Sequence, residues 1–557
     1  RLVTIPYDFA KCERTHRINN FAVAGVLKEG KFIGRRYNDS DVFKVIEGAS
    51  YSLNNHPDPE LEKYLDELIH KIASAQEEDG YLYTCRTIHP DSLPERAGKK
   101  RWSYLKSSHE LYNVGHMYEA AVAHYRATGK ESFLIVALKN ANLICNTFGP
   151  EEDKLHGVPG HQEIEIGLVK LYRVTGEEKY LRMAKYFLDQ RGNPESHELY
   201  TYGENGENKV YTQDHKPVTE QKEAVGHAVR AGYMYSGMAD VAALTGDKDY
   251  LEAIDQLWKN VTYKKLYITG GIGAKHAGEA FGPDYELPNL SAYCETCAAI
   301  ANMMWNQRLF LLHGDAKYVD VLERTLYNNF LSGVSIHGDK FFYPNPLESD
   351  GSHERSPWFD CACCPTNVGR FMPSLPGYVY AKKGNELFVN LFIGGKADVS
   401  MEFGKVHIQQ ETNYPWEGDV KITVDPVEEK NFTLNIRIPG WAQNEAVPGD
   451  LYHFKEKTKE KPDIKVNGKP NQINKKDGYA QINRKWNKGD QITLHLPMPV
   501  RKVIAHEKVE ADMGKFCIQR GPLVYAAEGV DNGGKVRNLL MDPKIQFNVN
   551  HNRELVD

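Results

Sequence analysis

Hydrophobic and polar positions along the first two-thirds of the chain repeat in a helical pattern. Amphipathic segments end at a glycine, a short polar turn follows, and a new segment opens with an aromatic and an aliphatic residue. Glycine is the usual residue after a helix, because it adopts the left-handed conformation without steric cost. The pattern occurs around Gly129, Gly176, Gly246 and Gly314, at unequal spacings that leave room for insertions. It predicts a series of helical hairpins.

Helical hairpins in series form either an open solenoid or a closed ring. Since an enzyme needs a central cavity, we expect closure into an α/α toroid of about six hairpins, an (α/α)6 barrel. We place this catalytic barrel at residues 1–380, with the first few residues free to pair with a later β region.

After about Tyr380 the apolar period changes from helical spacing to alternation, which predicts strands. Residues 387–393, 432–438 and 491–496 are typical of strands that stop at glycine or proline, and Asn467-Gly468 is a typical hairpin turn. We therefore expect residues 381–557 to form a β-sandwich region, as one sandwich or two small ones.

Histidines recur near the expected starts of the first helix of each hairpin. They are His109, His116, His161 and His227. A single histidine is usually a hydrogen-bonded structural residue. Because the N-termini of these helices converge on one face of an α/α barrel, several histidines at equivalent starts would line one pocket.

Five of the nine cysteines gather in two segments, 294–297 and 361–364. Neighbouring thiols such as Cys363 and Cys364 do not easily form a disulfide with one another, but both can bind one tetrahedral ion. Together with Cys297 and Glu295 they would make a shell of three thiolates and one carboxylate, which suits Zn²⁺. The four isolated cysteines are expected to be small buried apolar residues.

Glu279 follows a glycine-rich segment, residues 270–278, in which the backbone can approach a ligand closely. Two carboxylates near one cleft are the usual equipment of a glycosidase. Because Glu295 is expected to bind the metal, a thiolate is available for the second catalytic role.

Composition excludes several classes of function. The chain is 41% hydrophobic and 26% charged, as is ordinary for a globular protein, and its net charge of -6 argues against general nucleic-acid binding. The sequence contains no apolar run long enough to span a membrane. We expect a soluble protein of the bacterial cytoplasm or periplasm; the chain begins at Arg1, so a targeting segment would not be visible.

The motifs resemble those of one known family. Gly278-Glu279, Leu287-Pro288-Asn289, Glu295-Thr296-Cys297 and the segment 361–367 (CACCPTN) are similar to the β-L-arabinofuranosidases of glycoside hydrolase family 127, with family 146 close to it. The resemblance covers essentially the whole chain. It implies an α/α barrel followed by β-sandwich domains, and a retaining hydrolase that removes terminal β-L-arabinofuranosyl residues from plant glycans.

The resemblance also implies a role for each site residue. Zinc would be bound by Glu295, Cys297, Cys363 and Cys364, with Cys363 as the nucleophile and Glu279 as the general acid/base. The sugar would contact His109, His161, His227 and Tyr343.

Three alternatives stay open at this point. The substrate could be a related acidic furanoside, such as aceric acid of pectin side chains. The zinc could be structural, in a non-catalytic carbohydrate-binding scaffold. The toroid could carry another enzyme, a polysaccharide lyase or an ordinary two-carboxylate hydrolase. An oligosaccharide or glycan substrate is the expected partner, and a homodimer is left open.

Overall fold

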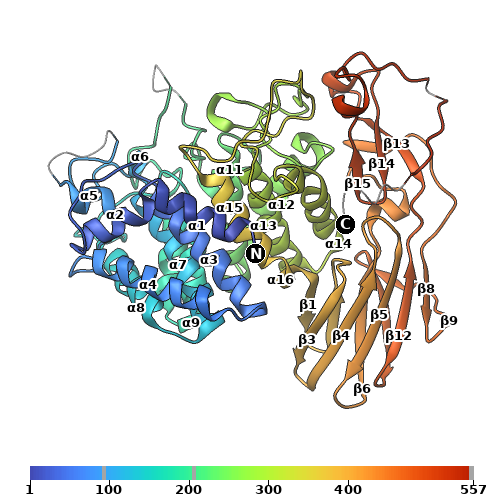
Figure 1. The fold of residues 1–557 in the computed structure, drawn as a ribbon, viewed down its shortest axis with the longest axis horizontal. Coiled ribbons are helices and arrows are strands. Elements are labelled where there is room, and N and C mark those ends of the chain that lie inside the picture. Colours follow the sequence, from blue (N-terminus) through green and yellow to red (C-terminus); the bar gives the residue numbers. More distant parts are fainter. Residues whose placement is uncertain (91–95, 204–207, 543, 551–557) are drawn as a thin grey trace.

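The computed structural model describes residues 1–90, 96–203, 208–542 and 544–550 of the chain. Within these ranges the α-helices end at Val379 and the strands begin at Tyr380. Figure 1 shows the helical part and the β part side by side, the β part being formed by the later residues.

A closed ring of six inner helices forms the centre of the described helical part. The inner helices are α3 (Asp39–Asn55), α7 (Glu110–Thr128), α9 (Ile164–Thr175), α11 (Ala228–Thr245), α13 (Thr296–His313) and α15 (Cys363–Phe371). Each helix contacts the next one, and α15 contacts α3, so the ring closes. The predicted α/α barrel followed by β-sheet domains is therefore confirmed.

Six outer helices cover the ring. They are α1 (Thr4–Arg14), α4 (Pro59–Ala75), α8 (Ser132–Thr147), α10 (Glu178–Gln190), α12 (Lys248–Asn260) and α14 (Ala316–Arg324). Five of them directly follow their inner partner, whereas α1 comes from the chain start and contacts α15 and α3, where the ring closes. The suggested pairing of the first residues with the β region is wrong, because residues 1–3 join no described strand and Thr4 begins α1.

Four further described helices are short. They are α2 (Arg17–Ala24), α5 (Thr84–Ile88), α6 (Leu105–Ser108) and α16 (Pro376–Val379). Of these, α6 directly precedes α7 and therefore belongs to the surroundings of His109.

Glycines end the inner helices as the hydrophobic pattern predicts. Gly129, Gly176, Gly246 and Gly314 follow α7, α9, α11 and α13, with φ values of 70–73°. A Cβ atom on any of the four would meet nothing within 4 Å. Glycine is needed there for its left-handed conformation, not for space.

Burial distinguishes the two rings of helices. The inner helix α11 is buried at every position from Ala228 to Ala242. The outer helix α12 buries only one face, at Tyr250, Ala253, Ile254, Leu257 and Trp258. A helix that is buried on all sides requires neighbours on all sides, which the double ring supplies.

Two sheets pack face to face in the β part. The five-stranded sheet has the order β1 (Tyr380–Lys383), β2 (Glu386–Val389), β6 (Lys430–Arg437), β11 (Tyr479–Trp486), β10 (Lys475–Lys476). The six-stranded sheet has the order β3 (Gly395–Met401), β4 (Gly404–Thr412), β5 (Asp419–Pro426), β12 (Asp490–His495), β8 (Asp463–Val466), β9 (Lys469–Pro470). Alternate positions of β5 and β6 are buried in the shared core.

A third sheet adjoins the sandwich. Its order is β15 (Leu523–Tyr525), β14 (Cys517–Arg520), β13 (Val500–Ala505), β7 (Tyr452–Phe454). A second small sandwich does not form among the described residues, because the C-terminal strands make this single sheet and borrow β7 from an earlier part of the chain.

The β part is joined firmly to the barrel. Arg437 of β6 is fully buried and bonds Asp320 at 2.6 Å and also Glu323, both on α14.

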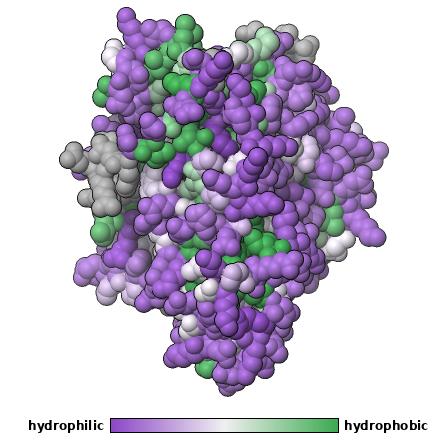
Figure 2. Space-filling model, turned by 90° about the vertical axis from the view of Figure 1, so that its right-hand side faces the viewer, coloured by the Kyte–Doolittle hydropathy of each residue, from purple (hydrophilic) through white to green (hydrophobic). Residues whose placement is uncertain are grey.

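None of the described helices is long and apolar enough to cross a membrane. The face shown in Figure 2 is mostly hydrophilic, with apolar side chains in separate groups.

Candidate active site

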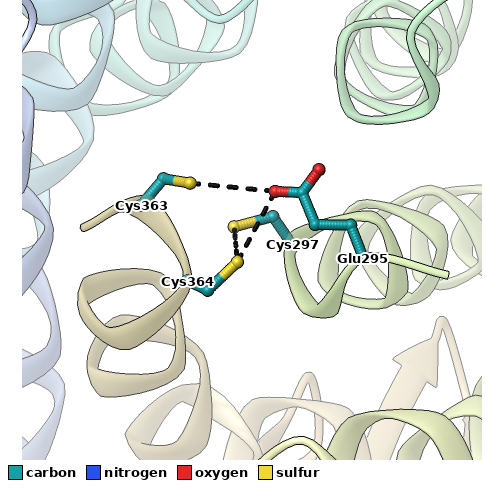
Figure 3. Close-up of side chains that lie close together, drawn as sticks. All are labelled: Glu295, Cys297, Cys363 and Cys364. Atoms are coloured by element: carbon teal, nitrogen blue, oxygen red, sulfur yellow. Dashed lines mark hydrogen bonds between the residues drawn. The ribbon is translucent and has the colours of Figure 1, made fainter. Parts of the chain in front are cut away.

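The N-termini of two neighbouring inner helices bring the thiols together. Glu295 precedes α13 and Cys297 lies in its first turn, while Cys363 and Cys364 begin α15. Sγ of Cys297 lies 3.3 Å from Sγ of Cys364, and Oε1 of Glu295 lies 3.5 Å from Cys364 and 3.7 Å from Cys363 (Figure 3). Helix N-termini favour negative charge, so this is a suitable place for thiolates.

The donor set fits one tetrahedral ion. The four ligand atoms lie within 4.8 Å of one another, and ligands around a single zinc at about 2.0–2.3 Å stand roughly 3.5–3.8 Å apart. Oε2 of Glu295 is buried without a hydrogen-bond partner. Burial raises the pKa of Glu295 well above its ordinary value, so this carboxyl needs a cation in order to ionise.

One thiol of the cluster has a lowered pKa, whereas burial raises the pKa of Cys364 well above its ordinary value. Burial raises the pKa of Cys297, but hydrogen bonds with Cys363 and Cys364 outweigh it and bring the pKa down to about 7. Four acidic groups this close ionise together only if a cation balances them. The residues present therefore fit the zinc site that the sequence predicts.

Three of the predicted histidines form a row at the same end of the ring. His109 and His227 are the residues just before α7 and α11, and His161 lies shortly before α9. The ring centroids of His109 and His161 are 5.9 Å apart, and those of His161 and His227 are 5.7 Å apart. The structure thus brings these three residues together, as the convergence of helix N-termini predicts.

Glu279 is held at the end of this row. Nε2 of His227 lies 2.7 Å from one carboxylate oxygen, and the hydroxyl of Tyr293 donates to the other at 3.1 Å. Nδ1 of His227 accepts from the backbone N–H of Val229, so the imidazole proton is on Nε2 and points to Glu279. His227, Glu279 and Glu295 offer ligand atoms within 4.8 Å of one another, which places Glu279 beside the thiol cluster.

The charge state of Glu279 follows from these contacts. Burial raises the pKa of the Glu279 carboxyl, but the hydrogen bonds from His227 and Tyr293 and the charge of Arg230 outweigh burial and hold the pKa below its ordinary value. Glu279 is therefore a carboxylate at neutral pH in the free protein.

Tyr343 touches the cluster directly. The Cys363 thiol donates to its hydroxyl at 3.1 Å, and Cys361 lies 3.6 Å from the same oxygen. Every predicted site residue is thus within one region; the catalytic, ligand and sugar-binding roles stay predictions.

Sequence reasoning missed some members of this region. The ring of Tyr112 lies 4.4 Å from that of His161, and it follows His109 by three positions on α7, a helical spacing that could have revealed it. Tyr293 lies in a loop and carries no such signal. His116 does not start a helix: it lies inside α7, fully buried, with Nδ1 2.9 Å from Glu163.

The polar interior continues past the thiols along the inner ring. Cys363, Asn367 and Arg370 follow one another on one face of α15. The Arg370 guanidinium contacts residues of every other inner helix or its start. These are Glu47 of α3, Glu119 of α7, Glu163 before α9, Tyr233 of α11 and Met304 of α13.

Cations fill this deeper cluster. His116, Glu119 and Glu163 are close enough together to hold a metal, but Arg370 and Lys170 both pair with Glu119. Arg370 is therefore committed to buried carboxylates and is not available for an acidic substrate.

Comparisons with known proteins agree along the chain. The model of the β-L-arabinofuranosidase catalytic domain of glycoside hydrolase family 127 matches residues 1–377, and the middle-domain and C-terminal-domain models of that family match residues 386–498 and 500–552. A curated relative, the non-reducing end β-L-arabinofuranosidase of Bifidobacterium longum subsp. longum, is 38% identical over 568 residues, covering 96% of this chain and 82% of the relative.

Solved structures give the same result. A family 127 β-arabinofuranosidase superposes with a TM-score of 0.90 at 54% identity, over 95% of this chain and 82% of the other. A family 127 β-L-arabinofuranosidase from Geobacillus stearothermophilus T6 has a TM-score of 0.87 at 43% identity, over 95% and 84% of the two chains. A non-catalytic scaffold is thereby set aside: this chain is a glycoside hydrolase and belongs to glycoside hydrolase family 127.

Proposed function

We propose that this hydrolase removes terminal β-L-arabinofuranosyl residues from plant glycans with retention of configuration, using Cys363 as nucleophile and Glu279 as acid/base. The observation that supports this most is the placement of the Glu295–Cys297–Cys363–Cys364 cluster directly beside the His227–Glu279 pair. The names of the relatives support the choice of sugar and the attack at the non-reducing end.

Glu295, Cys297, Cys363 and Cys364 would hold one Zn²⁺, which keeps the thiols deprotonated at neutral pH when it is bound. In the first step Sγ of Cys363 bonds to the anomeric carbon, and the glycosidic C–O bond breaks with its electron pair on the leaving oxygen. Glu279, when protonated, gives that oxygen its proton.

In the second step the Glu279 carboxylate takes a proton from water, and the water oxygen attacks the anomeric carbon. The C–S bond breaks and its electron pair returns to Cys363. Two displacements at one carbon retain the configuration. The hydrogen bonds from His227 and Tyr293 hold Glu279 in the carboxylate form that this step requires.

Product analysis tests the proposed function. Oligosaccharides ending in β-L-arabinofuranose should release arabinose whose first-formed anomer, seen by NMR, is β. A panel of other furanosides, including aceric acid glycosides, serves as comparison. Cleavage of another furanoside in place of arabinofuranose, or an inverted product, would contradict the proposal.

Glu279→Gln should keep the fold and lose about 10²–10⁴ of kcat/KM on glycosides with poor leaving groups. An activated aryl glycoside should lose much less, because its leaving group needs little protonation. Glu286→Gln is the matched control, since this carboxylate lies in the next loop and its side chain is 46% exposed. An equal loss on both substrates would show that Glu279 is not the acid.

Native protein should contain one zinc per chain, and chelation should lower the free energy of unfolding. A ligand at a thousand times its Kd stabilises the folded state by about 4 kcal/mol, and chelation removes that contribution. Metal analysis and thermal melts with and without chelator measure both effects. Cys364→Ser should lose the metal, whereas Cys517→Ser, whose thiol lies on β14, should keep it. Native protein without zinc would refute the site.

A further inference from the structure

Three cations belong to the surroundings of the histidine row. Arg36 precedes α3, Lys106 lies on α6 and Arg230 lies in the first turn of α11. Each is fixed by a backbone carbonyl: Arg36 donates to Ser107, Lys106 to Thr201, and Arg230 to Gly160 at 2.6 Å. Gly160 directly precedes His161, and Ser107 lies two residues before His109, so these contacts hold Arg36 and Arg230 near the histidine row.

Two tyrosine rings lie between Lys106 and Arg230. The Lys106 ammonium lies 4.5 Å from the ring centroid of Tyr202, Tyr202 lies 4.5 Å from Tyr211, and the Arg230 guanidinium lies 4.6 Å from Tyr211. These contacts orient the cations but do not neutralise them. Among the residues that the structure describes, Arg36, Lys106 and Arg230 each lack a carboxylate oxygen within 4.0 Å.

The charges also lie close to one another. Arg36 and Arg230 both act on His109 and, with burial as the larger cause, lower its pKa. Arg230 is only 6% exposed, and its Nε is buried without a hydrogen-bond partner. Arg230 also acts on the Glu279 carboxylate, but it forms no ion pair with it within 4.0 Å. Like charges without a directly paired anion in a partly buried place are costly, which favours a role in holding an anion.

The position of Tyr211 indicates which part of the substrate these cations would contact. Its ring lies 5.7 Å from that of His227, and a Cβ on Gly278, the residue before Glu279, would lie 3.4 Å from the Tyr211 ring. Glu279 is the proposed donor to the leaving oxygen, so the groups around Tyr211 lie on the leaving-group side.

We propose that Arg36 and Arg230, with Lys106, form a subsite for a carboxylate carried by the leaving group. The preferred substrate is thus an arabinofuranoside whose aglycone is an acidic sugar or another carboxylate-bearing unit. This inference rests on the proposed function for the identity of the terminal sugar. A guanidinium binds a carboxylate through paired, charge-assisted hydrogen bonds.

Two synthetic glycosides test the subsite, 4-carboxyphenyl and 4-carbamoylphenyl β-L-arabinofuranoside. In the native protein kcat/KM should favour the carboxylate about tenfold over the amide at low salt, and the preference should shrink as salt increases. Arg230→Gln and Arg36→Gln should each remove most of that ratio. Arg501→Gln is the matched control, a buried arginine stacked on Phe454 in the distant third sheet, and it should keep the ratio.

The outcomes separate the two proposals. A ratio near one in the native protein, or a ratio that survives in both Arg36→Gln and Arg230→Gln, overturns the subsite and leaves the hydrolase intact. If neither glycoside is cleaved, the proposed sugar is wrong. The subsite is then judged by calorimetry with 4-hydroxybenzoate and 4-hydroxybenzamide, of which only the benzoate should bind, and more weakly to the Arg36→Gln protein.

Discussion

Cys363→Ser should lose at least about 10⁴ of kcat with every glycoside, activated or not. A serine hydroxyl is far less acidic than a thiol, and it is a weaker ligand for a soft metal. No later step rescues the loss, because the bond to the anomeric carbon is never formed. Steady-state kinetics measure the effect, and metal analysis of the same protein shows whether zinc has been lost as well.

Covalent trapping tests whether Cys363, and not another of the four proposed metal ligands, is the nucleophile. An arabinofuranosyl epoxide or haloacetamide should add its mass to the peptide containing Cys361, Cys363 and Cys364, and fragmentation should place it on Cys363. Cys361→Ser is the matched control: its thiol lies 3.9 Å from Cys363 but is outside the cluster of four, so that variant should still be labelled. A label on Glu279 or Glu295 would make this an ordinary carboxylate hydrolase.

Local signals in the sequence predicted the helical repeat because each signal acts within one turn of chain. The glycines after α7, α9, α11 and α13 have open space around a Cβ position, so only backbone conformation selects them. Ring closure depends on the contact between α3 and α15, which are far apart in the chain, and no local pattern encodes that pairing. The outer helix α1 also packs against α15 at this junction, although the two helices lie at opposite ends of the helical part of the sequence.

The error at His116 has a physical cause. The prediction placed His116 near a helix start, but Gly115 before it is a packing residue inside α7: a Cβ there would lie 2.7 Å from the backbone nitrogen of Ile164. Glycine is selected at that position for close helix approach, which a sequence pattern does not separate from a turn.

The candidate site was predictable in proportion to how distinctive its chemistry is. Three thiols and a carboxylate on two segments indicate a metal without any knowledge of the fold. Arginine and tyrosine have many structural uses. Arg230 and Tyr293 gained their meaning only when the fold placed Arg230 over the Tyr211 ring next to His227, and Tyr293 in hydrogen-bond contact with Glu279.

Arg370→Met should destabilise the barrel by about 3–5 kcal/mol, because it leaves buried carboxylates without their shared cation. Arg370 is 2% exposed and lies 3.2 Å from Glu47, 3.0 Å from Glu119 and 3.7 Å from Glu163. Lys170 remains near Glu47 and Glu119 but cannot reach all five inner-helix partners of the guanidinium. Chemical denaturation followed through the helical signal measures the loss.

The pKa values of Glu119 and Glu163 determine how strongly Arg370→Met destabilises the barrel. Burial raises the pKa of Glu119, but Lys170 and Arg370 outweigh burial and keep it low, whereas burial and the Glu119 charge raise the pKa of Glu163 well above its ordinary value. The Glu119 carboxylate is thus the negative charge with which Lys170 and Arg370 both pair. Removing Arg370 leaves the buried carboxylates with one cation fewer, so one of them must take up a proton in order to stay buried.

The variant should consequently recover part of its stability as pH falls. Loss of the guanidinium raises the native pKa of the carboxylate, and a group whose folded pKa lies above its unfolded value favours the folded state at low pH. Arg484→Met is the control, since this arginine lies on the sandwich strand β11, 35% exposed, and an exposed ion pair contributes little. If Arg370→Met and Arg484→Met unfold alike at neutral pH, the charged centre of the ring does not hold the inner helices together.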